Sequence, residues 1–152
     1  MILLSTIGPV TLGYRNGLLF CEFGKHKVDQ EPNKKLAKQI EDYFEGKKIV
    51  SFDAPIQDAT LFTRNCWRAC REIPYGTTIS YQDLAIRAGS PKASRAAGQA
   101  MRRNPLTIIT PCHRVISSKG LLHGYSGVTS PKSKELKRKQ FLIELEQRTI
   151  SL

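Results

Sequence analysis

The sequence has no long hydrophobic run. No stretch approaches the roughly 18 consecutive apolar residues that a membrane-spanning helix requires. The apolar residues 1–4 also lack the basic flank of a signal peptide. We therefore expect no membrane partner and no exported form of this chain.

The chain also lacks the cysteine spacing of a zinc site. No Cys-x-x-Cys pair is present, and the three histidines do not follow a zinc-finger pattern, so we expect no metal. The four cysteines are Cys21, Cys66, Cys70 and Cys112. Because nothing indicates secretion, we expect free thiols. The sequence leaves open whether Cys66 and Cys70, one helical turn apart, form a disulfide.

Acidic residues are scarce relative to basic ones. The sequence contains 24 Lys and Arg against 13 Asp and Glu, which gives a formal net charge of +11. A field of this sign attracts polyanions, and neutralising phosphates releases counterions from nucleic acid. Many basic proteins bind no nucleic acid, so the charge alone leaves both interpretations open.

The patterns predict a mixed α/β fold of the α+β type, with two lobes that share a core. Residues 1–54 form a small β-rich lobe with one helix, and residues 55–152 form a mostly helical domain. In the first lobe, β-type runs flank Asn16-Gly17, which predicts a hairpin. A helix is expected over residues 32–44 and a further strand over residues 49–52.

The second part contains a predicted helix-turn-helix over residues 80–103. A helix over residues 60–71 precedes it. Ser80 suits the N-cap of a short helix, and Ser90-Pro91 suits the start of the next, which extends to Arg103. This motif is common in protein cores. The arginines on its second helix favour the interpretation that it binds DNA.

Cys112 follows an apolar run at residues 106–110, which we interpret as a buried strand. A cysteine in this position is usually inert packing. However, His113 and Arg114 follow at once, and a cationic setting makes a thiolate available. Adjacent side chains of a strand point to opposite faces, so a direct Cys–His pair is not expected. The residues alone leave both interpretations open. A last helix is expected over residues 133–147.

The sequence from about Phe62 to Glu146 resembles the O6-alkylguanine-DNA alkyltransferase (methylated-DNA–protein-cysteine methyltransferase) family. The matching segments, in chain order, are Ile73-Pro74-Tyr75-Gly76, Ser80-Tyr81, Pro91-Lys92-Ala93, Arg95-Ala96, Gly98, Asn104-Pro105, Pro111-Cys112-His113-Arg114-Val115 and Gly124-Tyr125-Ser126-Gly127. Each segment alone is a weak signal, and their joint order carries the resemblance.

The resemblance implies a catalytic set. Cys112 is the alkyl acceptor, His113 acts on its thiol through a water, and Glu146 orients the imidazole. Asn104 braces the turn before the active-site segment, and Tyr81 helps to protonate the departing guanine.

The resemblance also implies a surface that binds substrate and DNA. Arg95 fills the gap left by the flipped nucleotide, and Met101 forms an apolar wall of the pocket. The remaining residues of this set are Ser94, Ala96, Arg114, Tyr125 and Ser126.

The implied activity is DNA repair by direct reversal. One alkyl group passes irreversibly from O6-alkylguanine in double-stranded DNA to Cys112, after the nucleotide is flipped out. O4-alkylthymine is a second substrate that the resemblance leaves open. We expect a monomer with no cofactor, located in the cytoplasm with the nucleoid of a prokaryote, or in a eukaryotic nucleus.

Some features depart from the family pattern. The connection over residues 128–134 is longer than usual, His123 stands where glycine is more common, and Lys139 is only one possible match to the family's pocket lysine. Two other functions stay open. A lesion sensor of the same fold would lack the nucleophile, and a sequence-specific regulator would discriminate among unmodified DNA sequences.

Overall fold

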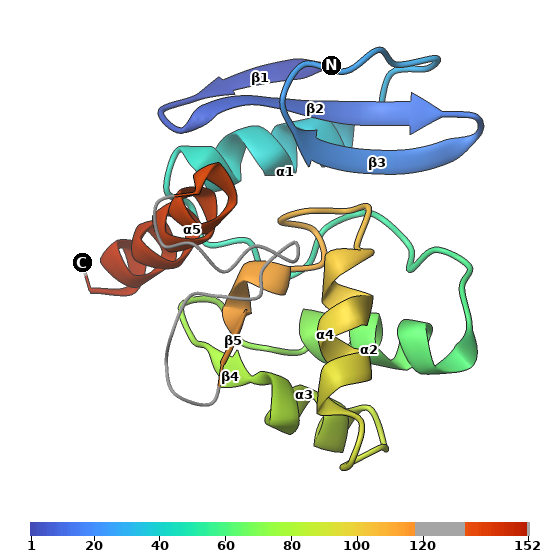
Figure 1. Cartoon of the computed structure of the whole chain (residues 1–152). Coiled ribbons are helices and arrows are strands. Elements are labelled where there is room, and N and C mark those ends of the chain that lie inside the picture. Colours follow the sequence, from blue (N-terminus) through green and yellow to red (C-terminus); the bar gives the residue numbers. More distant parts are fainter. Residues whose placement is uncertain (118–132, 152) are drawn as a thin grey trace.

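The computed structural model describes residues 1–117 and 133–151. It begins with an antiparallel three-stranded sheet in the order β1-β2-β3, formed by β1 (Ile2–Ser5), β2 (Gly8–Arg15) and β3 (Leu18–Phe23). Figure 1 shows this sheet at one end of the molecule. Asn16 and Gly17 join β2 to β3 with φ angles of 55° and 76°. Positive φ at both positions is what a tight type I′ hairpin requires, so the predicted hairpin is confirmed.

Helix α1 (Lys34–Phe44) packs beneath the sheet through Leu36, Ile40 and Tyr43, which recur at helical spacing and are buried. It begins after Asn33, whose side chain accepts a hydrogen bond from the Leu36 amide. The strand predicted over residues 49–52 is wrong. The Gln39 side chain bonds the Ser51 carbonyl and the Asp53 amide there, so a side chain takes the place of a strand partner.

The rest of the chain is mostly helical. Its elements are α2 (Leu61–Arg71), β4 (Ile79–Ser80), α3 (Tyr81–Arg87), α4 (Ser94–Arg102), the 3₁₀ turn η1 (Cys112–Arg114), β5 (Val115–Ile116) and α5 (Lys134–Ile150). The side chains of Thr60, Ser80 and Ser133 cap α2, α3 and α5. These helices confirm the predicted ones, although α5 extends beyond Gln147. Within the described ranges, no helix is long and apolar enough to cross a membrane.

The second helix of the helix-turn-helix begins later than predicted. Ser90 does not cap it. Instead, the Ala93 amide donates to the Ser90 carbonyl over 2.9 Å and closes a separate turn that contains Pro91. Helix α4 then begins at Ser94 with Ala93 as an N-cap that offers no side-chain acceptor. The Trp67 indole of α2 donates to the Ala100 carbonyl over 3.0 Å and fixes α4 against α2.

The strand predicted over residues 106–110 is also wrong. This segment forms turns, apart from one parallel bridge between Leu106 and Cys21 of β3. Ile108 has a φ of 76°, a conformation that interrupts any strand and that β-branched residues rarely adopt. The Thr110 amide donates to the Leu106 carbonyl over 2.8 Å and closes the loop. The apolar side chains are nevertheless buried, as the pattern indicated.

The buried side chains form two clusters. One lies within the helical part and contains Cys66, Cys70, Met101 and Cys112. The other lies between the sheet and α1 on one side and residues 106–109 and α5 on the other. The second cluster therefore draws on both of the predicted lobes, and it joins the sheet to the segment that leads to Cys112.

Candidate functional site

Cys112 is 2% exposed and stands on the 3₁₀ turn η1. We expected residues 112–113 to continue a strand, with their side chains on opposite faces, and this expectation is wrong. In a 3₁₀ turn with three residues per turn, successive side chains diverge by about 120°. Cys112 lies in the cluster of the helical part, whereas His113 bonds α5. The two side chains therefore leave the turn in different directions.

His113 is completely buried and bonded through one ring nitrogen. Its Nε2 lies 2.5 Å from Oε2 of Glu146. Its Nδ1 has no hydrogen-bond partner within residues 1–117 and 133–151. Burial lowers the pKa of His113, and the charges of Arg114 and Lys139 act in the same direction against the bond to Glu146. A neutral ring that donates from Nε2 to the carboxylate leaves Nδ1 as a proton acceptor.

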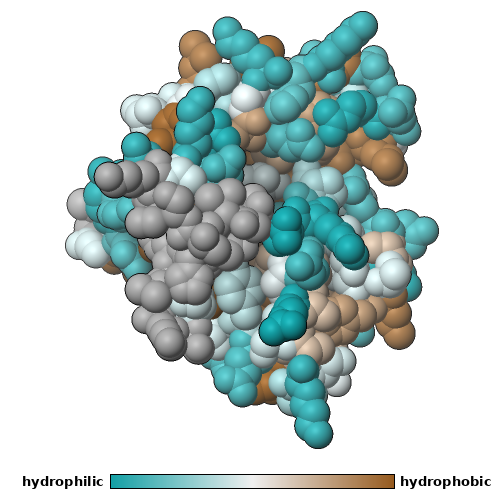
Figure 2. All heavy atoms as spheres, viewed as in Figure 1, coloured by the Kyte–Doolittle hydropathy of each residue, from teal (hydrophilic) through white to brown (hydrophobic). Residues whose placement is uncertain are grey.

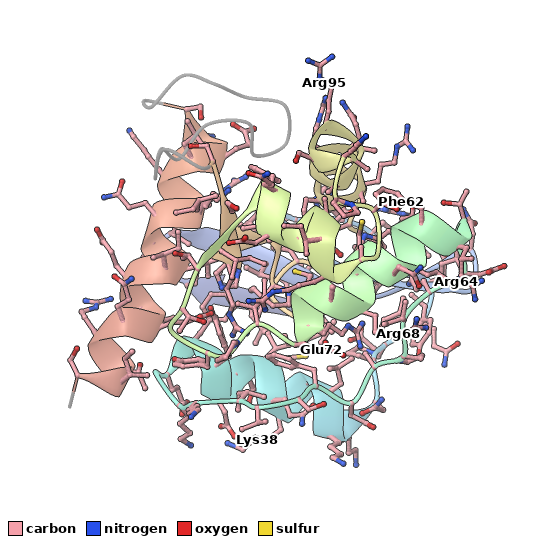
Figure 3. All side chains as sticks on the ribbon, turned by 90° about the horizontal axis from the view of Figure 1, so that it is seen from below. Lys38, Phe62, Arg64, Arg68, Glu72 and Arg95 are labelled. Atoms are coloured by element: carbon pink, nitrogen blue, oxygen red, sulfur yellow. The ribbon has the colours of Figure 1, made fainter. Side chains whose placement is uncertain are left out.

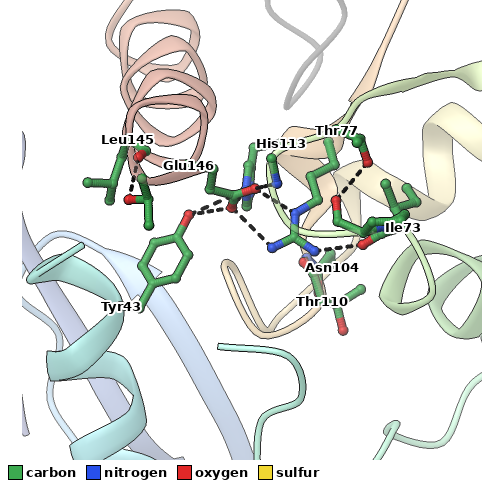
Figure 4. Close-up of polar contacts among 12 residues, drawn as sticks. Tyr43, Ile73, Thr77, Asn104, Thr110, His113, Leu145 and Glu146 are labelled. Atoms are coloured by element: carbon green, nitrogen blue, oxygen red, sulfur yellow. Dashed lines mark hydrogen bonds and ion pairs between the residues drawn. The ribbon is translucent and has the colours of Figure 1, made fainter. Parts of the chain in front are cut away.

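Glu146 is the centre of a buried hydrogen-bond network, drawn in Figure 4. Its Oε1 accepts from Arg114 Nε over 2.8 Å and from the Gly76 amide over 3.0 Å. Its Oε2 accepts from the Tyr43 hydroxyl over 2.6 Å and from Arg114 Nη2 over 3.1 Å. Burial raises the pKa of this carboxyl, but the bonds and charges of His113 and Arg114 hold it well below its usual range. Glu146 is therefore a carboxylate acceptor.

Arg114 occupies a different place from the one predicted. The resemblance implied a DNA contact, but the side chain is buried, and its Nη1 donates to the Ile73 carbonyl over 2.8 Å. Its Nε and Nη2 donate to Glu146, and its guanidinium lies 5.5 Å from the centre of the Tyr75 ring, so it compensates the buried carboxylate rather than facing a phosphate. Arg114 therefore belongs to the hydrogen-bond network of Glu146 and not to the residues that face DNA.

Asn104 bridges the loop that precedes Cys112. Its Nδ2 donates to the Thr110 carbonyl over 2.7 Å, and its Oδ1 accepts from the Leu106 amide over 2.9 Å. Both bonds hold residues 106–110 in their turns and deliver the chain from the end of α4 to η1. The bracing role of Asn104 in the reaction stays a prediction.

Tyr81 and Lys139 meet beside the thiol. Lys139 Nζ donates to the Val115 carbonyl over 2.6 Å and lies 3.4 Å from the Tyr81 hydroxyl. Burial lowers the pKa of Lys139 to about 8, while the neighbouring thiols Cys112 and Cys70 oppose that shift. Burial also raises the pKa of Tyr81 to about 12. The sequence left Lys139 as an ambiguous match, and the structure shows it next to the predicted proton donor.

The helix-turn-helix presents α4 at the surface. Arg95 and Ala96 are exposed, Ser94 is half-buried, and Met101 lies inside the cluster that contains Cys112. Figure 3 shows Arg95 at the outer end of its helix, directed away from the molecule. Hydrophilic side chains gather along α4 in Figure 2. The predicted pocket residues Tyr125 and Ser126 lie outside the described residues.

Sequence reasoning missed Tyr43. The helical spacing left either Tyr43 or Phe44 to continue the apolar stripe of Leu36 and Ile40, and Tyr43 is the completely buried one. Its hydroxyl, however, bonds Glu146, which follows it by 103 positions. No local pattern signals such a contact.

The cysteines carry no disulfide and build no metal site in the part of the chain that the structure describes. All four cysteines are buried, and Cys66 and Cys70 do not form a disulfide. Residues 1–117 and 133–151 contain no group of three or more His, Cys, Asp or Glu side chains placed to hold a metal ion.

The fold and the site together are those of a helix-turn-helix protein with a cysteine–histidine–glutamate centre. Residues 61–148 match the family described as 6-O-methylguanine DNA methyltransferase, DNA binding domain. The chain belongs to the methylated-DNA–protein-cysteine methyltransferase family.

Two curated relatives and one solved structure illustrate the similarity. The chain is 42% identical to a methylated-DNA–protein-cysteine methyltransferase of Methanosarcina barkeri, over 98% of this chain and 97% of the relative. It is also 42% identical to the constitutive enzyme of Bacillus subtilis, over 81% of this chain and 70% of the relative. The crystal structure of Mycobacterium tuberculosis OGT in complex with DNA matches with a TM-score of 0.78 at 34% identity, over 97% of this chain and 92% of that one.

Proposed function

We propose that this protein repairs DNA by moving the alkyl group of O6-alkylguanine in duplex DNA onto its own Cys112. The observation that carries the proposal is the buried network in which His113 and Glu146 adjoin the cysteine, on a fold that presents a basic helix. The relatives are named for this same transfer from methylated DNA to a protein cysteine.

The reaction begins with the deprotonation of the thiol, which is followed by a displacement at the alkyl carbon. The Cys112 thiol gives its proton to a water, which passes a proton to Nδ1 of His113, while Nε2 keeps its proton on the bond to Glu146. The thiolate then attacks the alkyl carbon. The sulfur–carbon bond forms, the bond from carbon to guanine O6 breaks, and its electron pair leaves with the guanine.

Tyr81 supplies the proton that the departing guanine takes up. Burial keeps the Tyr81 hydroxyl protonated at neutral pH, and Lys139 lies within reach to replace the proton. Because the thioether is stable and no second base regenerates the thiol, each chain reacts once. No external methyl donor is required, since the lesion itself is the donor.

The DNA-facing residues are those of α4. The exposed Arg95 replaces the flipped base in the stack, where its planar head can stack and donate hydrogen bonds at once. Ser94 and Ala96 stand in the first turn of α4, where the N-cap leaves backbone amides available to a phosphate. Met101 forms an apolar wall of the pocket that receives the flipped base.

The protein acts as a monomer where its DNA is, in the cytoplasm of a prokaryotic cell or the nucleus of a eukaryotic one. We assign residues 1–54 as a supporting lobe and residues 55–152 as the domain that binds DNA and accepts the alkyl group. Because residues 1–54 and residues 55–152 share a buried core, the first lobe supports the structure of the active protein.

The test of this function is the intact mass of the protein after it is mixed with a short duplex that carries O6-methylguanine. We expect a gain of one methyl group, saturating at one per chain, and peptide mapping should place it on Cys112. If the lesion is bound tightly and the mass does not change, the protein is a lesion sensor. Strong discrimination among unmodified duplexes at fixed salt would instead indicate a regulator.

Arg95→Ala should weaken repair of duplex DNA much more than the reaction with free O6-benzylguanine. Flipping a nucleotide costs a few kcal/mol and the inserted side chain offsets part of it, so we expect a loss of roughly 10- to 100-fold on duplex only. Single-turnover rates on both substrates measure this. Arg148→Ala, which removes an equal charge from an exposed position on α5, is the control. Equal losses on both substrates would remove the intercalation role from Arg95.

A further inference from the structure

Tyr43 links the first lobe of the protein to the reactive site. It belongs to α1, and its hydroxyl donates to Oε2 of Glu146 over 2.6 Å. The same oxygen accepts the bond from His113 Nε2, which lies 3.4 Å from the Tyr43 hydroxyl. Figure 4 shows the Tyr43 side chain pointing toward the carboxylate of Glu146. Among the described residues, it is the only one before residue 55 that bonds this network.

The donor role of Tyr43 follows from its surroundings. Burial and the adjacent Glu146 charge raise its pKa, so the hydroxyl keeps its proton. A carboxylate only accepts hydrogen bonds, so the proton points to Glu146. The ring is held by edge contacts with Phe44 and Tyr75, at centroid distances of 5.6 Å and 6.2 Å. The hydroxyl is therefore oriented before any substrate arrives.

We propose that Tyr43 is a positioning residue, which holds Glu146 against His113 and limits how strongly the carboxylate attracts the His113 proton. This rests on the proposed function, because it assigns His113 the part of a neutral base. A hydrogen bond to a carboxylate stabilises its charge and makes it a weaker acceptor for its other donors. Tyr43 thereby keeps the carboxylate from drawing a second proton onto the imidazole.

The charges around His113 show why this matters. Arg114 on η1 and Lys139 on α5 repel a proton from the ring, and burial acts in the same sense. Glu146 is the group that favours the protonated ring. The neutral state is thus a balance between these cations and one carboxylate, with the Cys112 thiol as the remaining titratable neighbour on the turn. Loss of the Tyr43 hydroxyl shifts that balance toward an imidazolium, which cannot accept the thiol proton.

The test compares Tyr43→Phe with Tyr75→Phe. Each change removes one buried hydroxyl and keeps the ring, but only the Tyr43 hydroxyl bonds Glu146. The rate of single-turnover alkylation by O6-benzylguanine is measured across pH, with melting temperatures recorded for both proteins. We expect the acid limb of the Tyr43→Phe profile to move upward by about one pH unit, the scale of one hydrogen bond to a charged group. The acid limb of the Tyr75→Phe profile should lie at the same pH as that of the parent protein.

A purely structural role would lower the melting temperature or the whole rate profile and leave the acid limb in place, and that result would overturn the proposal. If Tyr43→Phe does not fold, 3-fluorotyrosine introduced at position 43 alone provides the second variant. Its more acidic hydroxyl donates a stronger bond, so the acid limb should move to lower pH. If the acid limb of the 3-fluorotyrosine variant does not move, the proposed role of Tyr43 is rejected as well. Absence of alkylation in the parent would instead reject the proposed function.

Discussion

The Cys112→Ser protein should bind a duplex that carries O6-methylguanine and transfer no alkyl group in the time the parent needs to react completely. A serine hydroxyl is a far weaker nucleophile than a thiolate, and the removal of a catalytic nucleophile costs roughly 10⁴-fold or more in rate. Intact mass measures the transfer, and a gel-shift titration measures the binding.

Cys66→Ser is the matched control for this result. Cys66 is buried in the same cluster as Cys112 and belongs to α2 rather than to η1. A hydroxyl in the core costs about 1–3 kcal/mol in either variant, so comparable melting temperatures would separate chemistry from folding. The Cys66→Ser protein should still gain one methyl group. Alkylation of the Cys112→Ser protein at the parental rate would disprove the assignment of the acceptor.

Glu146→Gln should have the second largest effect, on both stability and rate. The change leaves Arg114 buried without its carboxylate, and breaking a buried ion pair costs about 3–5 kcal/mol. At roughly 2–4 °C per kcal/mol, the melting temperature should fall by about 10 °C. The transfer rate should fall by roughly 10²- to 10⁴-fold, because His113 loses the acceptor that fixes its tautomer. Glu144→Gln, two residues away and exposed, should leave both quantities unchanged.

The pH dependence of stability gives this prediction a second readout. The pKa of Glu146 lies below its value in the unfolded chain, so its contribution is complete above about pH 4.3 and is lost as the pH falls further. The parent and Glu146→Gln should therefore converge in stability at acid pH. Because the pKa of His113 is lowered in the folded protein, the unfolded chain takes up a proton on this histidine first, near pH 6.5. The folded state therefore loses stability as the pH falls below that value. A constant difference between the two proteins across this window would contradict the assignment.

Most elements of the fold could be predicted from local sequence patterns. Asn16-Gly17 predicted the hairpin, and Ser80 as an N-cap predicted the start of α3. The prediction was wrong where side chains replaced a regular ladder. Gln39 holds the segment expected as a strand at residues 49–52, and Asn104 holds residues 106–110 in turns.

The candidate site was predictable only in part. The order of motifs predicted that Glu146 orients His113, and the two side chains lie 2.5 Å apart. It assigned Arg114 to DNA, because an arginine after a histidine does not reveal its partner. The contact of Tyr43 with Glu146 could not be predicted, for a related reason. A tyrosine on the apolar stripe of a helix is usually core, and only the packing of α1 against α5 turns its hydroxyl toward Glu146.

The order of the site residues along the chain has a consequence for synthesis. A ribosome makes the cysteine, the histidine and the arginine before the carboxylate that pairs with the last two, so the nascent chain carries Cys112 through a period without a working base. Domains acquire structure as they emerge, and here the sheet and α1 emerge before the loop and the helix α5 that complete their buried core. A chain that ends before α5 would lack Glu146, so Arg114 would be buried without a compensating charge. We expect such a chain to be unstable and to be degraded before it can bind DNA.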